Sequence, residues 1–203
     1  MTRRLKEEDC AGVAAIDLAA RGHVATLAPL GPRFFATLYR AFVRSGRFEA
    51  FVDEVDGAVR GFVIGATAPA AAMKAARAHA LVPLGLLVLA RCARSPALVP
   101  RLVQTLAHLR SPAVGGPELM VISVDPAWQQ RGVGARLVVA LTEAFAQRGV
   151  TTYRVAAKAR LDGADAFYRR TGFHVVDHFT LYGEEWRMYE RRAAFGSGER
   201  AQL

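Results

Sequence analysis

Cysteine and long apolar runs are both scarce in this chain of 203 residues. Its two cysteines, Cys10 and Cys92, lie far apart, and neither belongs to a CxxC motif or has a clustered histidine beside it. The sequence therefore implies neither a disulfide framework nor a zinc site, and we expect no metal cofactor. The N-terminus has basic residues with no apolar segment behind them, which does not fit a secretory signal. We therefore expect a cytoplasmic protein.

Acidic residues are missing from a long stretch in the middle of the chain. No Asp or Glu lies between Ala68 and Gly116. The same stretch contains six basic residues: Lys74, Arg77, Arg91, Arg94, Arg101 and Arg110. The whole chain has a net charge of +9 and a pI near 10.4. Such a charge favours anionic partners, which include coenzyme A, nucleic acid, lipid headgroups and acidic proteins, and composition alone does not choose among them.

The length and the patterning indicate one domain with an insertion. A chain of 203 residues, 52% of them hydrophobic, is long enough for one well-packed domain. No internal repeat or low-complexity linker divides it. We expect a single domain over residues 1–191, a basic insertion at about residues 68–116 and a C-terminal tail over residues 192–203.

Helical signals fill the insertion. Ala70–Leu81 is alanine-rich, the stretch from about Pro83 to Arg94 is strongly apolar, and a further helical pattern begins near Pro100, so we expect two or three helices. The apolar run Ala80–Ala90 has about 11 residues against the roughly 20 that cross a bilayer, so we expect no transmembrane segment. Several roles remain open for the insertion: a solvated basic face, a homodimer contact, or a surface that meets a membrane, an acidic carrier protein or an anionic acceptor.

Outside the insertion, apolar periodicity switches between strand and helix spacing. We expect strands at about residues 3–6, 48–55, 59–64, 121–124, 151–157, 174–177 and 186–190. We expect helices at about residues 9–18, 31–46, 134–148 and 162–171. The pair Asp56-Gly57 suits a tight turn between the second and third strands. This order describes an α+β domain with a mixed, mostly antiparallel central sheet flanked by helices.

The most informative stretch joins a strand to a helix. The apolar run Val121–Val124 leads through Asp125-Pro126 into Gln129-Gln130-Arg131-Gly132-Val133-Gly134, and apolar residues then recur at helical spacing. Glycines at a helix N-terminus let an anion approach unpaired N–H groups and the positive end of the dipole, so a diphosphate is the natural ligand. The stretch lacks the Gly-Lys-[Ser/Thr] of a P-loop and is one spacing short of a dinucleotide fingerprint.

This stretch resembles the acetyl-coenzyme A signature of the GCN5-related N-acetyltransferase (GNAT) family, which is [Gln/Arg]-x-x-Gly-x-[Gly/Ala] after a strand ending in Val-x-Pro. A second block, residues 163–173, resembles the Ala-x-x-Phe-Tyr-x-x-x-Gly-Phe helix of the same family and follows at about the right separation. The resemblance covers most of the chain outside the insertion. It implies an acyl-CoA-dependent N-acetyltransferase that uses acetyl-CoA and acylates a primary amine of a small molecule or peptide by direct attack in a ternary complex.

The resemblance also implies roles for particular residues. The pyrophosphate of coenzyme A would lie on a loop made by Gln129, Gln130, Arg131, Gly132, Val133, Gly134 and Ala135. Val124 would supply backbone contacts to the pantetheine arm, and its N–H would meet the oxyanion. One departure from the family pattern is Leu161, where members often carry an asparagine that contacts pantetheine.

Two candidates carry the proton transfers. Tyr168 would give a proton to the departing thiolate, and the alternative is a core tyrosine with no such role. Glu118 occupies the place where the histone-modifying branch of the family has a glutamate base, and the alternative is a strand-end glutamate that faces water.

A different class of function also remains open, a non-catalytic coenzyme A-binding module that docks on membrane or nucleic acid through its basic helices. Such a module needs neither side chain. A third reading keeps the enzyme but takes the acyl group from an acyl carrier protein.

Overall fold

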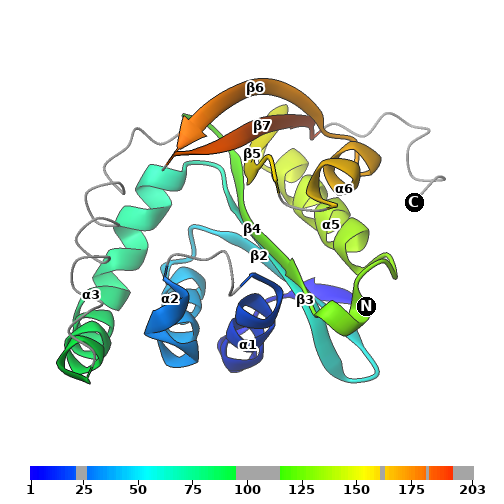
Figure 1. Ribbon diagram of the computed structural model, residues 1–203. Helices are drawn as coiled ribbons and strands as arrows, with labels where there is room; N and C mark the ends of the chain where they lie inside the picture. The colour runs from blue at the N-terminus through cyan, green and yellow to red at the C-terminus, as the bar shows by residue number, and fades with distance from the viewer. Residues whose placement is uncertain (22–26, 95–114, 161–162, 182, 194–203) are drawn as a thin grey trace.

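The computed structural model describes residues 1–21, 27–94, 115–160, 163–181 and 183–193 (Figure 1). The described strands form one sheet in the order β1-β2-β3-β4-β5-β7-β6, in which only β4 and β5 pair in parallel. The helices α1, α2 and α3 cover one face of this sheet, and α5 and α6 cover the other (Figure 1). The predicted α+β fold with a mixed, mostly antiparallel sheet is therefore confirmed.

The elements lie close to their predicted positions outside the insertion. The strands are β1 Thr2–Arg4, β2 Glu49–Val55, β3 Ala58–Ala66, β4 Glu118–Val124, β5 Thr152–Lys158, β6 His174–Leu181 and β7 Glu184–Arg192. The α-helices are α1 Cys10–Arg21, α2 Pro32–Ser45, α3 Pro69–Arg94, α5 Val133–Gln147 and α6 Ala164–Arg170. Short 3-10 helices are η1 Glu7–Asp9, η2 Ala28–Leu30 and η3 Pro126–Trp128. The tail predicted from residue 192 is strand at its first residue, and from residue 194 it lies outside the described part of the chain.

Each face of the sheet has its own hydrophobic core. On the α1–α3 face, the core is rich in aromatic side chains, including Phe34, Phe35, Tyr39, Phe42, Phe48 and Phe62. On the α5–α6 face, the apolar stripe of α5 meets the sheet and α6 through residues that include Leu137, Leu141, Phe145, Tyr153, Tyr168 and Tyr189. The predicted apolar periodicities of α2 and α5 are thus the buried faces of these two helices.

The turn between β2 and β3 has the predicted form. Asp56 and Gly57 have φ of 52° and 72°, and positive φ at both central residues is the requirement of a type I′ hairpin turn. This turn joins β2 to β3, and β3 pairs in turn with β4. The hairpin therefore places β3 beside the strand that forms one side of the candidate site.

The predicted helical insertion between the third and fourth strands is confirmed, but its division into helices differs from the prediction. A single helix, α3, runs from Pro69 to Arg94 through Pro83, where the sequence predicted two helices. A proline inside a helix removes one hydrogen bond and crowds the preceding turn, but neighbouring packing can carry the helix past it. Here Ala72, Ala76 and Ala80 are at most 4% exposed and hold the first half of α3 in the core beside α2. The third predicted helix falls in residues 95–114, outside the described part of the chain.

The continuity of α3 also changes the expectation about membranes. By length and composition alone, Pro69–Ala93 is long and apolar enough to cross a bilayer, with a mean hydropathy of 1.4. The apolar helix is thus longer than the run Ala80–Ala90 on which the expectation of no transmembrane segment rested. Only 17% of the apolar window is buried. A large part of this helix is therefore available to something outside the domain.

Candidate functional site

β4 and β5 are neighbours in the sheet but separate along most of their length. Within the described ranges they pair only between Glu118 and Arg154, and the Arg154 amide donates to the Pro117 carbonyl at 3.0 Å. Beyond this point β4 continues its ladder with β3, whereas β5 continues with β7. The facing edges of the two strands are therefore unpaired from Glu118 toward Val124, and we call the region between these edges the slot.

The backbone of Val124 faces this slot. The adjacent Asp125 amide donates to the Arg60 carbonyl at 2.8 Å, so Asp125 and Arg60 form a hydrogen-bonded pair. Bonded and non-bonded pairs alternate in an antiparallel ladder, and Val124 stands opposite Gly61 as the non-bonded pair. Its N–H and C=O therefore point away from β3 and toward the slot. An extended ligand that carries amide groups can pair with them as an added strand would.

The slot ends at a tight loop that leads into α5. Asp125 opens the loop by accepting a hydrogen bond from the Ala127 amide at 3.0 Å. Gln130 and Gly132 then both adopt positive φ, 60° and 78°. Positive φ is uncommon for a residue such as Gln130, and strained backbone of this kind is found most often at functional loops. Gly132 becomes the N-cap of α5, and its carbonyl accepts the first helical hydrogen bond from Arg136 at 3.0 Å.

The first turn of α5 is suited to an anion. The amides of Val133, Gly134 and Ala135 precede the first intrahelical donor, so they have no partner inside the helix. The turn contains no acidic residue, and the positive end of the helix dipole lies there. Arg131, immediately before the N-cap, is exposed and adds a positive charge at the same place. The predicted coenzyme A loop is therefore a helix N-terminus with positive charge and open donors.

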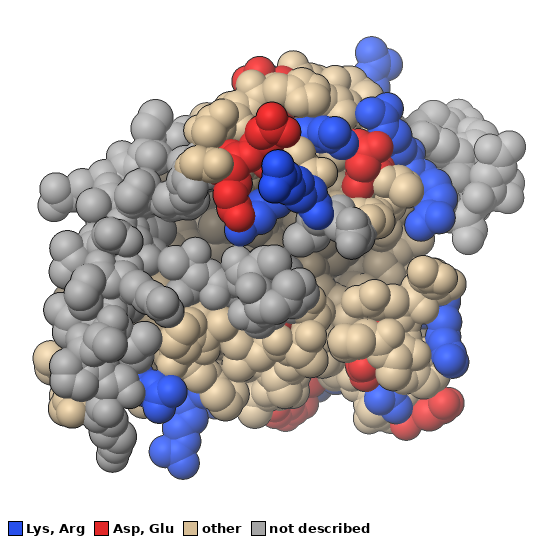
Figure 2. All heavy atoms as spheres, viewed as in Figure 1, with Lys and Arg blue, Asp and Glu red and all other residues tan. Residues whose placement is uncertain are grey.

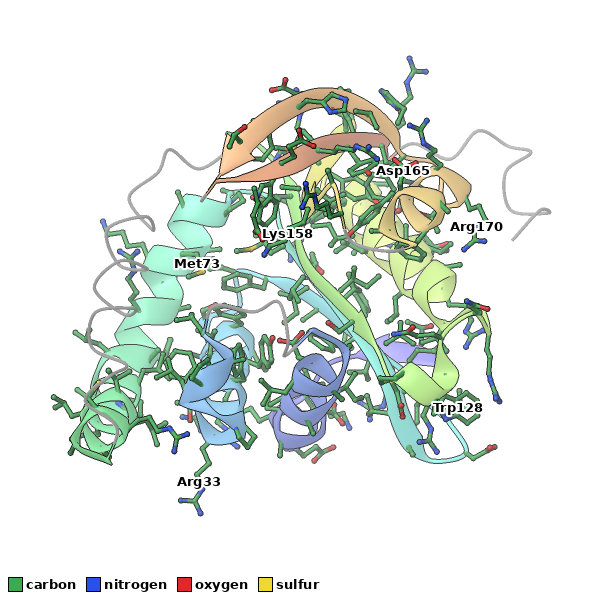
Figure 3. All side chains as sticks on the ribbon, in the orientation of Figure 1. Arg33, Met73, Trp128, Lys158, Asp165 and Arg170 are labelled. Carbon is green, nitrogen blue, oxygen red and sulfur yellow. The ribbon has the colours of Figure 1, made fainter. Side chains whose placement is uncertain are left out.

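Contacts between aromatic and charged side chains stabilise this loop. The guanidinium carbons of Arg60 and Arg131 lie 4.8 and 5.0 Å from the centre of the Trp128 ring, which Figure 3 shows beside the start of α5. Arg60 is also 3.6 Å from the carboxylate of Asp125. Asp125 is thus engaged in holding the loop. Gln129 is exposed, and its amide nitrogen is 3.5 Å from the Val124 carbonyl.

The two sequence motifs meet at Gly134. A Cβ placed on Gly134 would lie 2.8 Å from Cε2 of Phe167 and 3.7 Å from a methyl group of Val124. The first turn of α5, the end of β4 and the ring from α6 are therefore packed against one another. The sequence suggested that glycine at this position admits an anion. The structure adds a second reason for glycine, since any side chain here would push α6 away.

Tyr168 is 7% exposed and lies in an aromatic cluster on α6. Its ring centre is 5.4 Å from that of Phe173 in an edge-on arrangement and 4.9 Å from that of Tyr189 on β7. Because β7 pairs with β5, the cluster places Tyr168 over the β5 side of the slot. Tyr168 is therefore a buried residue of the core, and its role in proton transfer stays a prediction.

Polar contacts fix α6 to the sheet. Asp165, in the first turn of α6, accepts hydrogen bonds from the Tyr189 hydroxyl at 2.9 Å and from Arg187 at 3.2 Å, both on β7. Arg169 donates to the same carboxylate at 2.8 Å, and this bond is the main cause that lowers the pKa of Asp165. At the other end of the helix, the Arg191 guanidinium donates to the Thr171 carbonyl. Both ends of the seven-residue helix are thus held, which fixes Tyr168 between them.

Glu118 lies at the closed end of the slot, where β4 and β5 meet. The side chain is half-buried, and burial raises the pKa of its carboxyl group. The β3–β4 register shifts between Ile64 and Gly65, which leaves Met120 as an extra residue in β4. Leu119 packs in the α5 core while Val121 packs in the α1–α3 core, so the bulge reverses the alternation. Glu118 therefore shares the α1–α3 face with Val121.

A buried polar network on that face was not predicted from the sequence. Asp17 of α1 is 1% exposed and accepts hydrogen bonds from the Tyr39 hydroxyl and the Ser123 hydroxyl, each at 2.7 Å. Ser123 immediately precedes Val124 on β4. The network joins α1 and α2 to the strand that borders the slot, and its two buried hydrogen bonds rigidify that junction. In the sequence, Asp17 stands among alanines and apolar residues with no motif around it.

Two further features lie outside the slot. A cavity of about 600 Å³ borders the far side of α5 and is lined by residues of β1, β2 and α5, including Phe51 and Arg136. It borders Gly132 and Ala135 but no residue of β4 or β5, so it does not replace the slot as the candidate site. In the described part of the chain, no group of three or more His, Cys, Asp or Glu side chains could hold a metal ion.

The structure thus brings most of the predicted site residues to one slot. Val124 and the loop Gln129–Ala135 lie at its open end, and Glu118 lies at its closed end. Tyr168 lies on α6, and α6 packs against the start of α5 through the contact of Phe167 with Gly134. Leu161, the departure from the family pattern, lies outside the described residues. The roles of all these residues remain predictions.

Comparison with known proteins supports the resemblance found in the sequence. Residues 102–175 match the family model described as the acetyltransferase (GNAT) domain. None of the curated protein sequences compared with this chain matches it significantly. The predicted resemblance to the GNAT family is confirmed by this match and by the fold.

Solved acetyltransferase structures share the fold along the whole chain. The ribosomal-protein-S18-alanine N-acetyltransferase from Escherichia coli is 16% identical, with a TM-score of 0.58, and the match covers 98% of this chain and 97% of that one. The PaiA N-acetyltransferase from Thermoplasma acidophilum, solved with coenzyme A, is 13% identical with a TM-score of 0.61, covering 95% and 98%. YncA from Salmonella typhimurium, solved with acetyl-CoA, is 15% identical with a TM-score of 0.61, covering 97% and 95%.

Proposed function

We propose that this protein is an acyl-CoA-dependent N-acyltransferase that transfers an acetyl group from acetyl-CoA to a primary amine. The observation that carries the proposal is the slot between β4 and β5, which ends on the open first turn of α5. A pantetheine arm is extended and contains amides, and it is joined to a diphosphate, so it matches both parts of this slot. The GNAT domain match and the neighbours solved with coenzyme A or acetyl-CoA support the same donor.

The donor would be held largely by backbone groups. The diphosphate would accept hydrogen bonds from amides of the loop, where Gln130, Arg131, Gly132, Val133, Gly134 and Ala135 lie. The exposed Arg131 would add a charge contact, and the exposed Gln129 would flank the entry. The Val124 N–H and C=O, which face the slot, would pair with the pantetheine amides or meet the thioester. Backbone recognition of this kind survives most side-chain changes, because the donors belong to the fold.

The transfer itself needs three proton movements, two away from the acceptor nitrogen and one to the departing sulfur. Glu118 would take a proton from the acceptor ammonium, directly or through water, and its raised pKa makes its carboxylate a stronger base. The free amine nitrogen then attacks the thioester carbonyl carbon, so a C–N bond forms and the oxygen becomes an oxyanion that the Val124 N–H can stabilise. As the carbonyl re-forms, the C–S bond breaks and the thiolate leaves, while the nitrogen releases its second proton to water to give the neutral amide. Tyr168 would give its hydroxyl proton to this thiolate.

The acceptor would enter from the α1–α3 face. Glu118 shares that face with the Asp17 and Ser123 network, whereas Tyr168 and the diphosphate loop belong to the α5–α6 side. The thioester would lie in the slot between them, with its carbonyl open to attack from the opposite side. The acceptor is a small-molecule or peptide amine, and a cytoplasmic location remains part of the proposal.

Thiol release tests the proposal against a non-catalytic coenzyme A-binding module. The protein would be incubated with acetyl-CoA and a panel of amines, amino sugars and peptides, and free coenzyme A thiol would be followed over time. Release above the hydrolysis rate with at least one amine, together with an acetylated amine found by mass spectrometry, supports an enzyme. Tight coenzyme A binding with no acetylated product across the panel supports the binding module instead.

A further inference from the structure

The C-terminal half of α3 presents large aliphatic side chains to solvent. Leu81, Val82, Leu86 and Leu89 are 74%, 71%, 63% and 68% exposed. At 3.6 residues per turn these positions fall within less than half of the helix circumference, so they form one continuous strip. We call this strip the aliphatic face of α3. Most large hydrophobic side chains that remain exposed in the described residues belong to it, the others being Met1 and Val176.

The opposite side of α3 is fixed to the domain. Ala72, Ala76 and Ala80 are at most 4% exposed and belong to the α1–α3 core. Near the far end of the helix, Arg91 donates to the Pro29 carbonyl at 2.9 Å, which ties α3 to the segment before α2. A helix that crossed a bilayer would have to leave these contacts. The aliphatic face is therefore displayed on a helix that stays attached to the protein.

Positive charge borders the aliphatic face. Lys74 and Arg77 of α3 are exposed beside this face, and Arg91 and Arg33, on the side of α3 that meets α2, are exposed as well. Figure 2 shows basic side chains at the lower left, where Figure 1 places the adjoining ends of α2 and α3 and Figure 3 labels Arg33. The sequence has no acidic residue between Ala68 and Gly116 to balance these charges. A strip of apolar side chains with basic borders is the pattern of helices that lie in a lipid interface.

We propose that α3 docks this protein on an anionic lipid surface, with the aliphatic face inserted among the acyl chains and the bordering basic residues on the headgroups. The helix lies on the membrane instead of crossing it, because its alanine side remains in the domain core. Leu86 and Leu89 are inserted, while Lys74 and Arg77 interact with lipid phosphates. The docking does not depend on the acetyltransferase reaction, so either proposal can fail without the other.

The composition of the face favours lipid over a protein partner. Protein interfaces gather aromatic side chains and arginine at their centres, where a few such residues supply most of the affinity. The aliphatic face has only leucine and valine, with basic residues at its edges, and Pro69–Ala93 is apolar enough to lie in a bilayer. Aliphatic side chains that insert among acyl chains need no complementary shape. This face therefore fits a fluid apolar phase better than a shaped pocket.

The charge argues against a second copy of the chain as the partner. A two-fold dimer through this face would place the same surface on both sides, so the basic borders would face one another. No acidic residue of the sequence between residues 68 and 116 could relieve that repulsion. An anionic lipid surface has negative headgroups directly above apolar acyl chains. It can therefore bind the basic residues and the aliphatic face of α3 at the same time.

Vesicle binding tests the proposal with the full chain. Co-sedimentation would be measured with vesicles of phosphatidylcholine alone and with vesicles that contain a large share of phosphatidylglycerol. The parent should bind the anionic vesicles, and added salt should weaken the binding. The variant Leu86→Gln with Leu89→Gln should bind at least about tenfold more weakly, since glutamine keeps helix propensity but loses the apolar surface. The matched control is Val176→Gln, an exposed apolar position on β6 that should leave binding unchanged.

A second pair of variants separates charge from apolar insertion. Lys74→Gln with Arg77→Gln should weaken binding to anionic vesicles, whereas Arg47→Gln, an exposed basic residue elsewhere, should have a much smaller effect. Leu86→Trp should show a blue-shifted emission with vesicles that brominated acyl chains quench, which reports insertion without any loss of folding. Equal binding to neutral and anionic vesicles, or none to either, would overturn the proposal. So would analytical ultracentrifugation that shows a dimer broken by the Leu86 and Leu89 changes.

Discussion

The ring of Phe167 closes over Gly134, so that a Cβ on the glycine would lie 2.8 Å from the ring. This contact joins the loop-to-helix motif to the α6 motif, which are separated by some thirty residues in the sequence. We predict that Gly134→Ala forces Phe167 and α6 to shift and lowers the free energy of unfolding by about 1–3 kcal/mol. Urea denaturation followed by circular dichroism would measure the change.

A second helical glycine provides the control. Gly12 of α1 is exposed and has no atom within 4 Å of the position of an added Cβ. Gly12→Ala should therefore raise the free energy of unfolding by about 0.5–1 kcal/mol, through the ordinary preference of helices for alanine. If both substitutions changed stability in the same direction, the Phe167 contact would not explain why residue 134 is glycine.

Tyr168→Phe is expected to lower the rate of transfer while it leaves the fold intact. Phenylalanine keeps the ring contacts with Phe173 and Tyr189, whose centres lie 5.4 and 4.9 Å away. Loss of a positioned general acid should reduce kcat by about 10²-fold or more with donor affinity nearly unchanged. Steady-state kinetics together with calorimetric titration of coenzyme A would measure both quantities.

Tyr153→Phe is the matched control for Tyr168→Phe. Tyr153 is also a buried tyrosine of the same core, its hydroxyl is 2.7 Å from that of Thr142, and burial raises its pKa to about 12. Tyr153→Phe should lower stability by about 1 kcal/mol and leave kcat unchanged. Equal kcat losses in the two variants would assign the effect of Tyr168 to packing, not to proton transfer.

The raised pKa of Glu118 predicts a pH dependence of the reaction. Burial raises this pKa above its ordinary value of 4.5, and the base is active only when ionised. The value of kcat/KM should therefore rise with pH through the raised pKa in the parent. Glu118→Gln should abolish this rise and recover much of the lost rate at high pH, where the amine is already free. An unchanged pH–rate profile in Glu118→Gln would exclude Glu118 as the base.

The carboxyl group of Glu118 also affects the stability of the fold. Its contribution to stability falls as pH rises, whereas the reaction rate is expected to increase. Because the folded state has the higher pKa, the protonated carboxyl stabilises the fold below the unfolded pKa, and this contribution is lost as pH rises through the folded pKa. The parent should therefore lose stability relative to Glu118→Gln as pH increases from about 4 toward neutral. Thermal unfolding of both proteins across this range would measure the difference.

The Asp17 network should carry measurable coupling between α2 and β4. Tyr39→Phe and Ser123→Ala each remove one hydroxyl that donates to the buried carboxylate, and each should lower stability by about 1–3 kcal/mol. Because the two hydroxyls donate to the two oxygens of one carboxylate, the double variant should deviate from additivity by at least about 0.5 kcal/mol. A strictly additive double-mutant cycle would show that the two hydrogen bonds act independently.

Local sequence patterns predicted those parts of the fold that depend on neighbouring residues. The Asp56-Gly57 turn needed only two adjacent residues with positive φ, and the start of α2 at Pro32 needed only the local preference of proline. The loop around Gly132 was predictable for the same reason, because the glycine at the helix start and the apolar spacing of α5 are adjacent in the sequence.

Features that depend on distant contacts were not predictable. Asp17 acquires its role from Ser123, 106 residues away, and no pattern near Asp17 points to that partner. The helix α3 passes Pro83 because its alanine side is held by the core, which the local helix-breaking tendency of proline cannot show. The extra residue at Met120, which sets the face that Glu118 occupies, arises from the pairing of β4 with β3. The exposure of Leu81 and Leu86 likewise depends on which side of α3 the domain covers.

Coenzyme A binding at the first turn of α5 is the central claim, and Ala135→Glu tests it most directly. A glutamate at the third helical position suits a helix N-terminus, so the fold should be kept, but its carboxylate occupies the amides and repels a diphosphate. Ala140→Glu adds the same charge about 7.5 Å further along the helix axis and is the control. Calorimetric titration should show coenzyme A affinity at least about tenfold weaker in Ala135→Glu and nearly unchanged in Ala140→Glu. Equal affinity in Ala135→Glu and the parent would contradict the account.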